Sequence, residues 1–149
     1  DFEQMRDTLL AVSGELDTSM YGRPTLLTDP GNLRRTLYAF VERQNTPAMV
    51  QTFDFANADT STPRRPNTTV PQQALFAMNS EFVLHRAKDL ASRVHNLEPI
   101  DAIKQMSAIV YGRTLTEDEL RDYIDFCAHN TREHFAQVLL MSNELMFLD

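Results

Sequence analysis

The amino-acid sequence predicts an all-α fold, an irregular bundle of about seven short helices with one long irregular loop near the middle. Apolar residues recur at steps of three and four through most of the chain, which is the spacing of one face of a helix. The strict alternation of a half-buried strand occurs nowhere. Because no period of roughly 20 to 50 residues recurs, we expect an irregular bundle and not a repeat array.

Composition places the chain among ordinary globular domains. Its 149 residues are 42% hydrophobic and 23% charged, and a domain of this length buries roughly 69% of the surface that its unfolded chain exposes. No apolar run approaches the roughly 20 residues of a membrane-spanning helix. The net charge of −7 disfavours nucleic acid, whose phosphates require a basic face. We therefore expect one domain over residues 1–149, with no nucleic-acid partner and no membrane span.

The first 43 residues predict two helices and a connection between them. An apolar stripe and a C-terminal cap at Gly14 indicate a helix over residues 2–14. Glycine and proline interrupt residues 15–31, which predicts a connection over the surface. A second stripe predicts another helix within residues 31–43. The two stripes consist of Phe2, Met5, Leu9 and Val12, and of Leu33, Leu37, Phe40 and Val41.

Residues 46–69 form the predicted long loop. They are rich in proline, threonine and asparagine and have no sustained periodicity. Long structureless segments are uncommon inside compact domains and are often functional, so this loop is the first place to look for a site. Phe53 and Phe55 indicate that it is anchored to the core.

Five more helices are predicted in the rest of the chain. A Thr69–Gln72 capping box with Pro71 starts the first, and Asn79–Ser80 separates it from the second. The third begins at Pro99 and closes at Gly112. The fourth starts at a Thr116–Glu119 capping box with a Leu115–Leu120 staple, and Thr131 caps the fifth.

Each of these five helices has an apolar stripe that is expected to face inward. The stripes consist, in order, of Ala74, Leu75 and Met78; of Val83, Ala87, Leu90, Val94 and Leu97; of Ile100, Ile103, Met106 and Val110; of Leu120, Tyr123, Ile124 and Cys127; and of Phe135, Val138, Leu139 and Leu145.

The sequence offers little for catalysis or metal binding. The four histidines, of which His85 is the first, have neither paired spacing nor a cysteine pair at zinc spacing. Cys127 lies on an apolar face, where burial raises the pKa of a thiol and makes it inert. No phosphate loop, nucleophile elbow or haem-attachment motif occurs. We predict no catalytic residue, no metal site and no cofactor within these residues.

Two arginine pairs are the strongest polar candidates. Guanidinium groups bind carboxylates, phosphates and sulfates, and they also tether loops through main-chain carbonyls, so both roles stay open. Asp54 and Asp59, beside the second pair, are either partners in ion pairs that fix the loop or an acid–base pair. The candidate ligand-binding residues are Arg34, Arg35, Asp54, Arg64 and Arg65.

Negative charge is concentrated in the C-terminal third. Residues 98–149 contain 4 basic and 10 acidic residues. Such a surface is either a solvated helix face or a docking patch for a basic partner. The candidate docking residues are Glu117, Asp118, Glu119, Asp122 and Asp125.

Five segments of the chain resemble one protein family. They are Arg34–Gln44, Gln51–Phe55, Arg64–Leu75, Met78–Ser80 and Ser142–Leu145. Together they resemble the bacterial, mainly planctomycete, domain of unknown function at the C-terminus of large proteins that often carry a cytochrome-c-like domain. The resemblance runs in order from the first helix to the final residues, and it brings no known activity with it.

The resemblance implies that this chain is the C-terminal fragment of a larger domain in an exported protein, located in the periplasm or outside the cell. Many relatives have a cysteine in the long loop where this chain has Ser61 or a neighbour, so no role of that cysteine carries over. The family signature adds Gln72 and Gln73 to the candidate ligand-binding residues. A missing N-terminal portion implies an exposed apolar patch or self-association.

We expect a non-enzymatic helical interaction or scaffold module of a multidomain exported protein, with other domains of that protein as partners. The long loop and its arginines would form the recognition surface for a partner domain or an acidic glycan. One alternative is a docking domain for a c-type cytochrome domain, bound by the acidic helices. The other is part of an enzyme acting on acidic polysaccharides, in which Arg64 and Arg65 hold the anion and Asp54 or His85 carries the proton.

Overall fold

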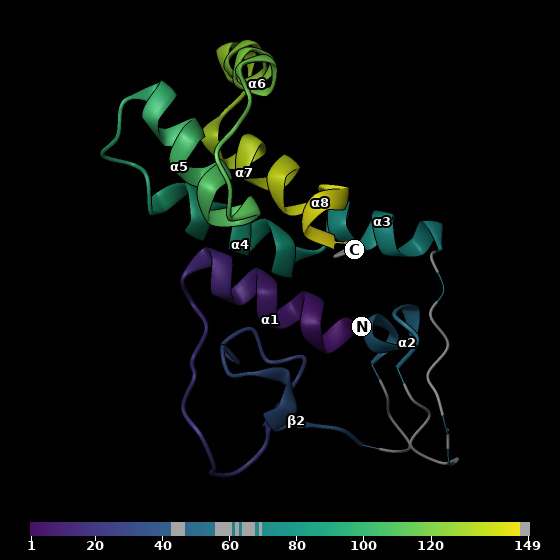
Figure 1. Cartoon of the computed structure of the whole chain (residues 1–149). Coiled ribbons are helices and arrows are strands. Elements are labelled where there is room, and N and C mark those ends of the chain that lie inside the picture. The colour runs from purple at the N-terminus through teal and green to yellow at the C-terminus, as the bar shows by residue number, and fades with distance from the viewer. Residues whose placement is uncertain (43–46, 56–60, 62, 64–67, 69, 147–149) are drawn as a thin grey trace.

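The computed structural model describes residues 1–42, 47–55, 61, 63, 68 and 70–146, and its fold is predominantly helical (Figure 1). The helices are α1 (Phe2–Ser13), α2 (Ala48–Thr52), α3 (Pro71–Asn79), α4 (Glu81–Ser92), α5 (Pro99–Tyr111), α6 (Glu117–His129), α7 (Arg132–Leu140) and α8 (Asn143–Met146). The 3-10 turn η1 (Thr36–Tyr38) and two short parallel strands, β1 (Thr25–Leu26) and β2 (Ala39–Phe40), lie between α1 and α2. The prediction of a helical fold is confirmed.

The main core forms around α4, which packs against both α1 and α7. Figure 1 shows α1 and α4 side by side in the same direction, with α7 returning antiparallel. The predicted stripe of α4 is buried as expected from Val83 to Val94, and it shares one cluster with side chains of α1, α5 and α7. Those partners include Leu9, Met106 and Phe135.

A smaller core joins the N-terminus to the predicted long loop. It consists of Phe2, Leu27 and Val50, with Phe53 and Phe55 packed against them. The ring centroid of Phe53 lies 5.7 Å from that of Phe2 and 5.4 Å from that of Phe76. The prediction that Phe53 and Phe55 anchor the loop is therefore confirmed. The prediction that the whole loop is irregular is wrong, because α2 forms within it.

The predicted second helix, within residues 31–43, is wrong. The described part of this segment forms only η1 and then β2, which pairs in parallel with β1. A further bridge joins Asp17 to Arg34. The predicted stripe is also not buried, since Leu37 is 75% exposed and Phe40 is 47% exposed.

Two side chains of α1 bind the main-chain groups of this segment that a helix would pair internally. Arg6 donates to the main-chain oxygens of Asn32 and Arg34 and to the Thr36 hydroxyl. The Asp7 carboxylate accepts hydrogen bonds of 2.7 Å from both the amide and the hydroxyl of Thr36. Because a helix would use these main-chain groups internally, the contacts to α1 favour an extended chain.

The helix ends follow the sequence closely. Gly14 and Gly112 close α1 and α5 in the left-handed conformation, with φ of 87° and 68°, where a side chain would be strained. The Thr116–Glu119 capping box and the Thr131 cap are present. At α3 the cap lies one residue later than predicted, at Val70, and Gln73 accepts a hydrogen bond from the Val70 amide.

Several residues predicted to face inward are exposed. On α3, Ala77 is buried and Phe76 packs against the core in place of the predicted stripe. On α7 the predicted Phe135 and Leu139 are fully buried, together with Ala136 and Leu140. On α6 no residue is fully buried, because this helix packs on the bundle only along one edge, against α5 and α7. The exposed residues are Ala74, Leu75, Met78, Leu97, Ile100, Ile124 and Val138.

An arginine clamp joins the start of α6 to α8. Arg113 binds the Glu119 carboxylate with bonds of 2.7 and 2.9 Å, and it binds the Glu144 carboxylate with two bonds of 2.7 Å. The bonds to Arg113, together with the bond from the Thr116 amide, lower the pKa of Glu119 from its ordinary 4.5 to about 2. The clamp therefore holds both acids ionised at neutral pH.

This pKa predicts how the clamp depends on pH. A lowered pKa means that Glu119 stabilises the fold above pH 4.5 and that this contribution disappears as the pH falls toward 2. We expect Glu119→Gln to lower the melting temperature at pH 7, and the melting curves of the variant and the wild type to converge toward pH 2. Glu117→Gln, on the same turn but outside the clamp, is the control. A difference that persists unchanged at pH 2 would contradict the assignment.

Candidate functional site

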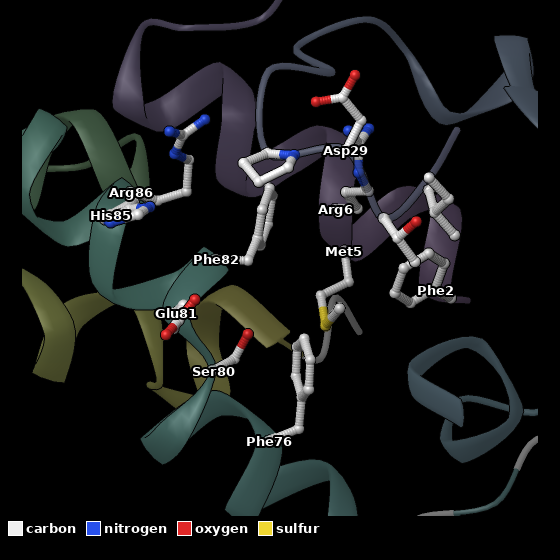
Figure 2. Close-up of a pocket in the computed structure, with 13 residues that line it drawn as sticks. Phe2, Met5, Arg6, Asp29, Phe76, Ser80, Glu81, Phe82, His85 and Arg86 are labelled. Carbon is white, nitrogen blue, oxygen red and sulfur yellow. The ribbon is translucent and has the colours of Figure 1, made fainter. Parts of the chain in front are cut away.

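A pocket of about 390 Å³ lies between α1, the loop of residues 27–30 and the junction of α3 with α4 (Figure 2). This volume is within the range of sites for small ligands. We call it the Arg86 pocket. Its apolar lining consists of Phe2, Met5, Leu27, Pro30, Phe76 and Phe82, and its polar lining of Arg6, Thr28, Asp29, Ser80, Glu81, His85 and Arg86.

Arg6 is a structural part of the pocket wall. Its side chain is 3% exposed, and its donors are used by the segment that follows β1. Burial lowers the pKa of Arg6, the Asp7 carboxylate at 3.8 Å opposes that effect, and the charge of Arg86 adds to it. Two guanidinium groups thus share a buried region in which each raises the free energy of the other.

Arg86 is the exception among the buried cations. The residue is 8% exposed, yet its Nε and Nη1 have no hydrogen-bond partner in the described residues. Its Nη2 lies 2.9 Å from Asp89 Oδ2, an ion-pair contact without hydrogen-bond geometry. A buried N–H group without a partner costs about 1–3 kcal/mol. Arg86 therefore offers unused donors at the wall of the pocket.

The ring of Phe82 separates the two arginines. The guanidinium carbons of Arg6 and Arg86 lie 5.5 and 5.4 Å from its centroid, and Figure 2 shows them on opposite sides of the ring. Phe82 and Arg86 are four residues apart on α4, so they share the face that the helix turns toward α1. This face stabilises both cations through the ring and leaves the donors of Arg86 available.

Other arginines of the chain bind main-chain carbonyls. Arg93 donates to the Val12 oxygen at the end of α1. Arg132 donates to three carbonyls at the end of α4, and Arg34 to three in residues 19–23. Arg34 also leaves its Nε without a partner, but it lies outside the Arg86 pocket. Arg86 differs because it binds no carbonyl of the described residues.

The acidic residues of the pocket lie nearer to solvent than its arginines. Asp29 and Glu81 are exposed, and Asp29 Oδ1 accepts a hydrogen bond of 2.9 Å from the Gly31 amide. His85 is also exposed. Because exposed charges are screened by water and salt, they offset the buried cations only in part.

The first predicted arginine pair has a structural position. Arg34 stacks on Tyr38, with its guanidinium carbon 4.2 Å from the ring centroid, and it ties together the connection that follows α1. Arg35 lies 3.9 Å from Asp7, and its side chain is 53% exposed. Neither lines the Arg86 pocket.

Two of the candidate residues, Asp54 and Gln73, hold the two ends of the long loop together through Thr68. Asp54 accepts hydrogen bonds from the amide and hydroxyl of Thr68, and these bonds lower the pKa of its carboxyl. Gln73 donates to the carbonyls of Thr52 and Thr68, and Gln72 is exposed. Arg64, Arg65 and Asp59 lie outside the described residues.

The acidic candidates lie on or beside the exposed face of α6. Glu119 is used by the capping box and the arginine clamp, and Asp118 pairs with Arg121 at 3.1 Å. Glu117, Asp122 and Asp125 are exposed. The structure thus brings these acids to one helix, separate from the Arg86 pocket.

Within the described ranges of the chain, the remaining reactive groups form no second site. Cys127 is partly exposed and lines a pocket of about 320 Å³ with Arg132, and burial raises the pKa of its thiol. The donors of that arginine are used by carbonyls. Among the described residues there is no group of three or more histidine, cysteine or acidic side chains that could hold a metal, and no helix is long and apolar enough to cross a membrane.

Neither Arg6 nor Arg86 is among the site residues predicted from the sequence. Both occupy positions of buried helix faces, since Arg6 follows Phe2 by four residues and precedes Leu9 by three, and Arg86 lies between Val83 and Leu90. A cation at a stripe position is the signal that could have identified them.

Substitution of the two pocket arginines is expected to change stability in opposite directions. Arg6→Met leaves three acceptors without their donor, and we expect it to lower the free energy of unfolding by about 3 kcal/mol. Arg86→Met removes a buried charge with unused donors, and we expect stability to stay the same or to rise by about 1 kcal/mol. Urea denaturation measures both. Equal losses would show that Arg86 is as structural as Arg6.

Comparison with known proteins gives a family and no activity. Residues 1–127 match the family PSD1, described as a protein of unknown function (DUF1553). No curated protein and no solved structure matches the chain. Since the match spans more than half of its residues, the chain belongs to the DUF1553 family of unknown function.

Proposed function

We propose that this chain is a non-enzymatic helical binding module whose Arg86 pocket holds an anionic group of its ligand. The observation that carries the proposal is the pair of unpartnered nitrogens of Arg86 at the wall of a pocket of ligand size. Buried guanidinium groups pair with carboxylates or oxyanions when they are fully used. An anion in the pocket would supply partners for these two nitrogens, which have none among the described residues.

The surroundings of the pocket support binding and not turnover. Its wall is fixed by Arg6 and by the Phe2–Phe53 contact, so it holds its shape without a ligand. Asp54, the acid of the polysaccharide-enzyme alternative, has a lowered pKa and is bound to Thr68, which makes it a poor proton donor. His85 lines the pocket but is exposed, and within the described part of the chain no hydrogen bond or ion pair joins its ring to an acid.

The proposal places the module in a larger exported protein, in the periplasm or outside the cell, with other domains of that protein as its partners. The resemblance to the C-terminal domain of large planctomycete proteins supports this context. The exposed apolar side chains of the α3–α4 region, among them Leu75 and Met78, support contact with another domain or a second copy.

A second candidate function is docking of a c-type cytochrome domain on α6. This helix stands away from α1 and α4 in Figure 1 and buries no residue completely. Its acidic side chains Glu117, Asp122 and Asp125 are exposed to solvent. Such a face attracts a basic partner through long-range charge.

The anion proposal predicts a specific pattern of stabilisation. We expect millimolar acetate or inorganic phosphate to raise the melting temperature of the wild type above that in chloride, because a ligand bound only to the folded state stabilises it. Arg86→Met should abolish the shift, and Arg121→Met, which removes a 75% exposed arginine, should keep it. Equal shifts in the wild type and Arg86→Met would reject the pocket as the site.

The docking proposal predicts strong dependence on salt. We expect affinity for a basic c-type cytochrome to fall steeply between low and physiological ionic strength, and to fall further in a variant with Glu117, Asp122 and Asp125 changed to their amides. Isothermal titration calorimetry measures both. Binding that is independent of salt would exclude this mode.

A further inference from the structure

We infer that the anionic group held by the Arg86 pocket is the carboxylate of a small organic acid with an aromatic or similarly bulky apolar body. The inference rests on the proposed function and adds the class of ligand to it. Three features of the pocket carry it: the apolar walls, the single guanidinium with two unpartnered nitrogens, and the exposed acids.

The walls of the pocket require an apolar body. Six of its lining residues are apolar, and three of these are phenylalanines. Figure 2 shows Phe2, Phe76 and Met5 grouped together on the side of the pocket away from Arg86. A small hydrated anion would bind at Arg86 but would leave this apolar surface in contact with water. A ligand with a ring or a branched chain removes that surface from water.

The unused donors of Arg86 indicate the charge of the ligand's head group. Arg6 has already given its donors to Asn32, Arg34 and Thr36, so one guanidinium remains for the ligand. Its Nε–H and Nη1–H lie on opposite sides of the guanidinium group, so one of them can donate to an oxygen of a carboxylate while the other donates to a water. The match is to a single negative charge.

The acids of the pocket disfavour a doubly charged head group. Asp29 and Glu81 carry two negative charges, which offset the two positive charges of Arg6 and Arg86. A third carboxylate, that of Asp89, already lies 2.9 Å from Arg86. A phosphate monoester, which carries nearly two charges at neutral pH, meets more repulsion from these groups than a carboxylate does. The balance of charge therefore favours a monocarboxylate.

The ligand is then expected to lie in one orientation. Its carboxylate reaches Arg86 beside the ring of Phe82, and its apolar body extends toward Phe2, Met5 and Phe76. The pocket volume of about 390 Å³ accommodates a body of one ring and a short chain.

A series of matched probes tests this assignment by isothermal titration calorimetry. The probes are 3-phenylpropanoate, its neutral counterpart 3-phenylpropan-1-ol, acetate, and phenyl phosphate. We expect 3-phenylpropanoate to bind about tenfold or more tightly than each of the others, since a charge-assisted bond and the burial of a ring each contribute on the order of one power of ten.

Two variants locate the site. Arg86→Met should lower the affinity for 3-phenylpropanoate to that of the alcohol while the variant stays folded by its melting curve, and Arg121→Met should bind as the wild type does. To test the apolar wall without relying on a buried core residue, Met5→Gln should weaken 3-phenylpropanoate more than acetate.

The outcomes separate the inference from the proposed function. If phenyl phosphate binds more tightly, or if acetate equals 3-phenylpropanoate, the ligand class is wrong and the anion site stands. If the alcohol equals 3-phenylpropanoate in the wild type, the charge has no part in binding and both fail. If none of the anions binds, or Arg86→Met binds them all unchanged, both fail as well.

Discussion

The burial of α4 between α1 and α7 is the constraint on which the rest of the structure depends. One side of α4 supplies the apolar stripe of the main core, in which Leu90 is fully buried. Another side, with Phe82, Arg86 and Arg93, faces α1. Because a helix is rigid, packing the first side fixes the second, so the same burial that stabilises the bundle also presents Arg86 at the pocket wall.

Arginine is the residue that joins the elements of this small domain. Arg6, Arg93 and Arg132 each cross from one segment to another and donate to main-chain carbonyls. These carbonyls lie at helix ends or in connections, where no amide of a regular helix is available to them. Arg86 departs from this pattern, and the departure is what turns a structural residue type into a candidate for ligand recognition.

Much of the candidate site could not be predicted from sequence, for reasons that differ between residues. Arg34, Asp54 and Gln73 were predicted as polar candidates by their composition and family signature, and the structure shows each of them holding loop backbone. Whether a guanidinium binds a carbonyl or remains available depends on what lies within about 3 Å of it. That information is not local in the chain, since the acceptors of Arg6 come from residues 32–36.

The sequence by itself determined the helical class, the caps at Gly14, Gly112, Thr116 and Thr131, and the buried stripe of α4. These depend on residues within one or two turns of each other, where periodicity and capping chemistry act directly. Only the tertiary structure decided that residues 31–42 form η1 and β2 in place of a helix, and that Arg86 lines a pocket with unused donors. Both outcomes depend on contacts with α1, and the free energy of such long-range contacts outweighs the weak local preference of a short helix.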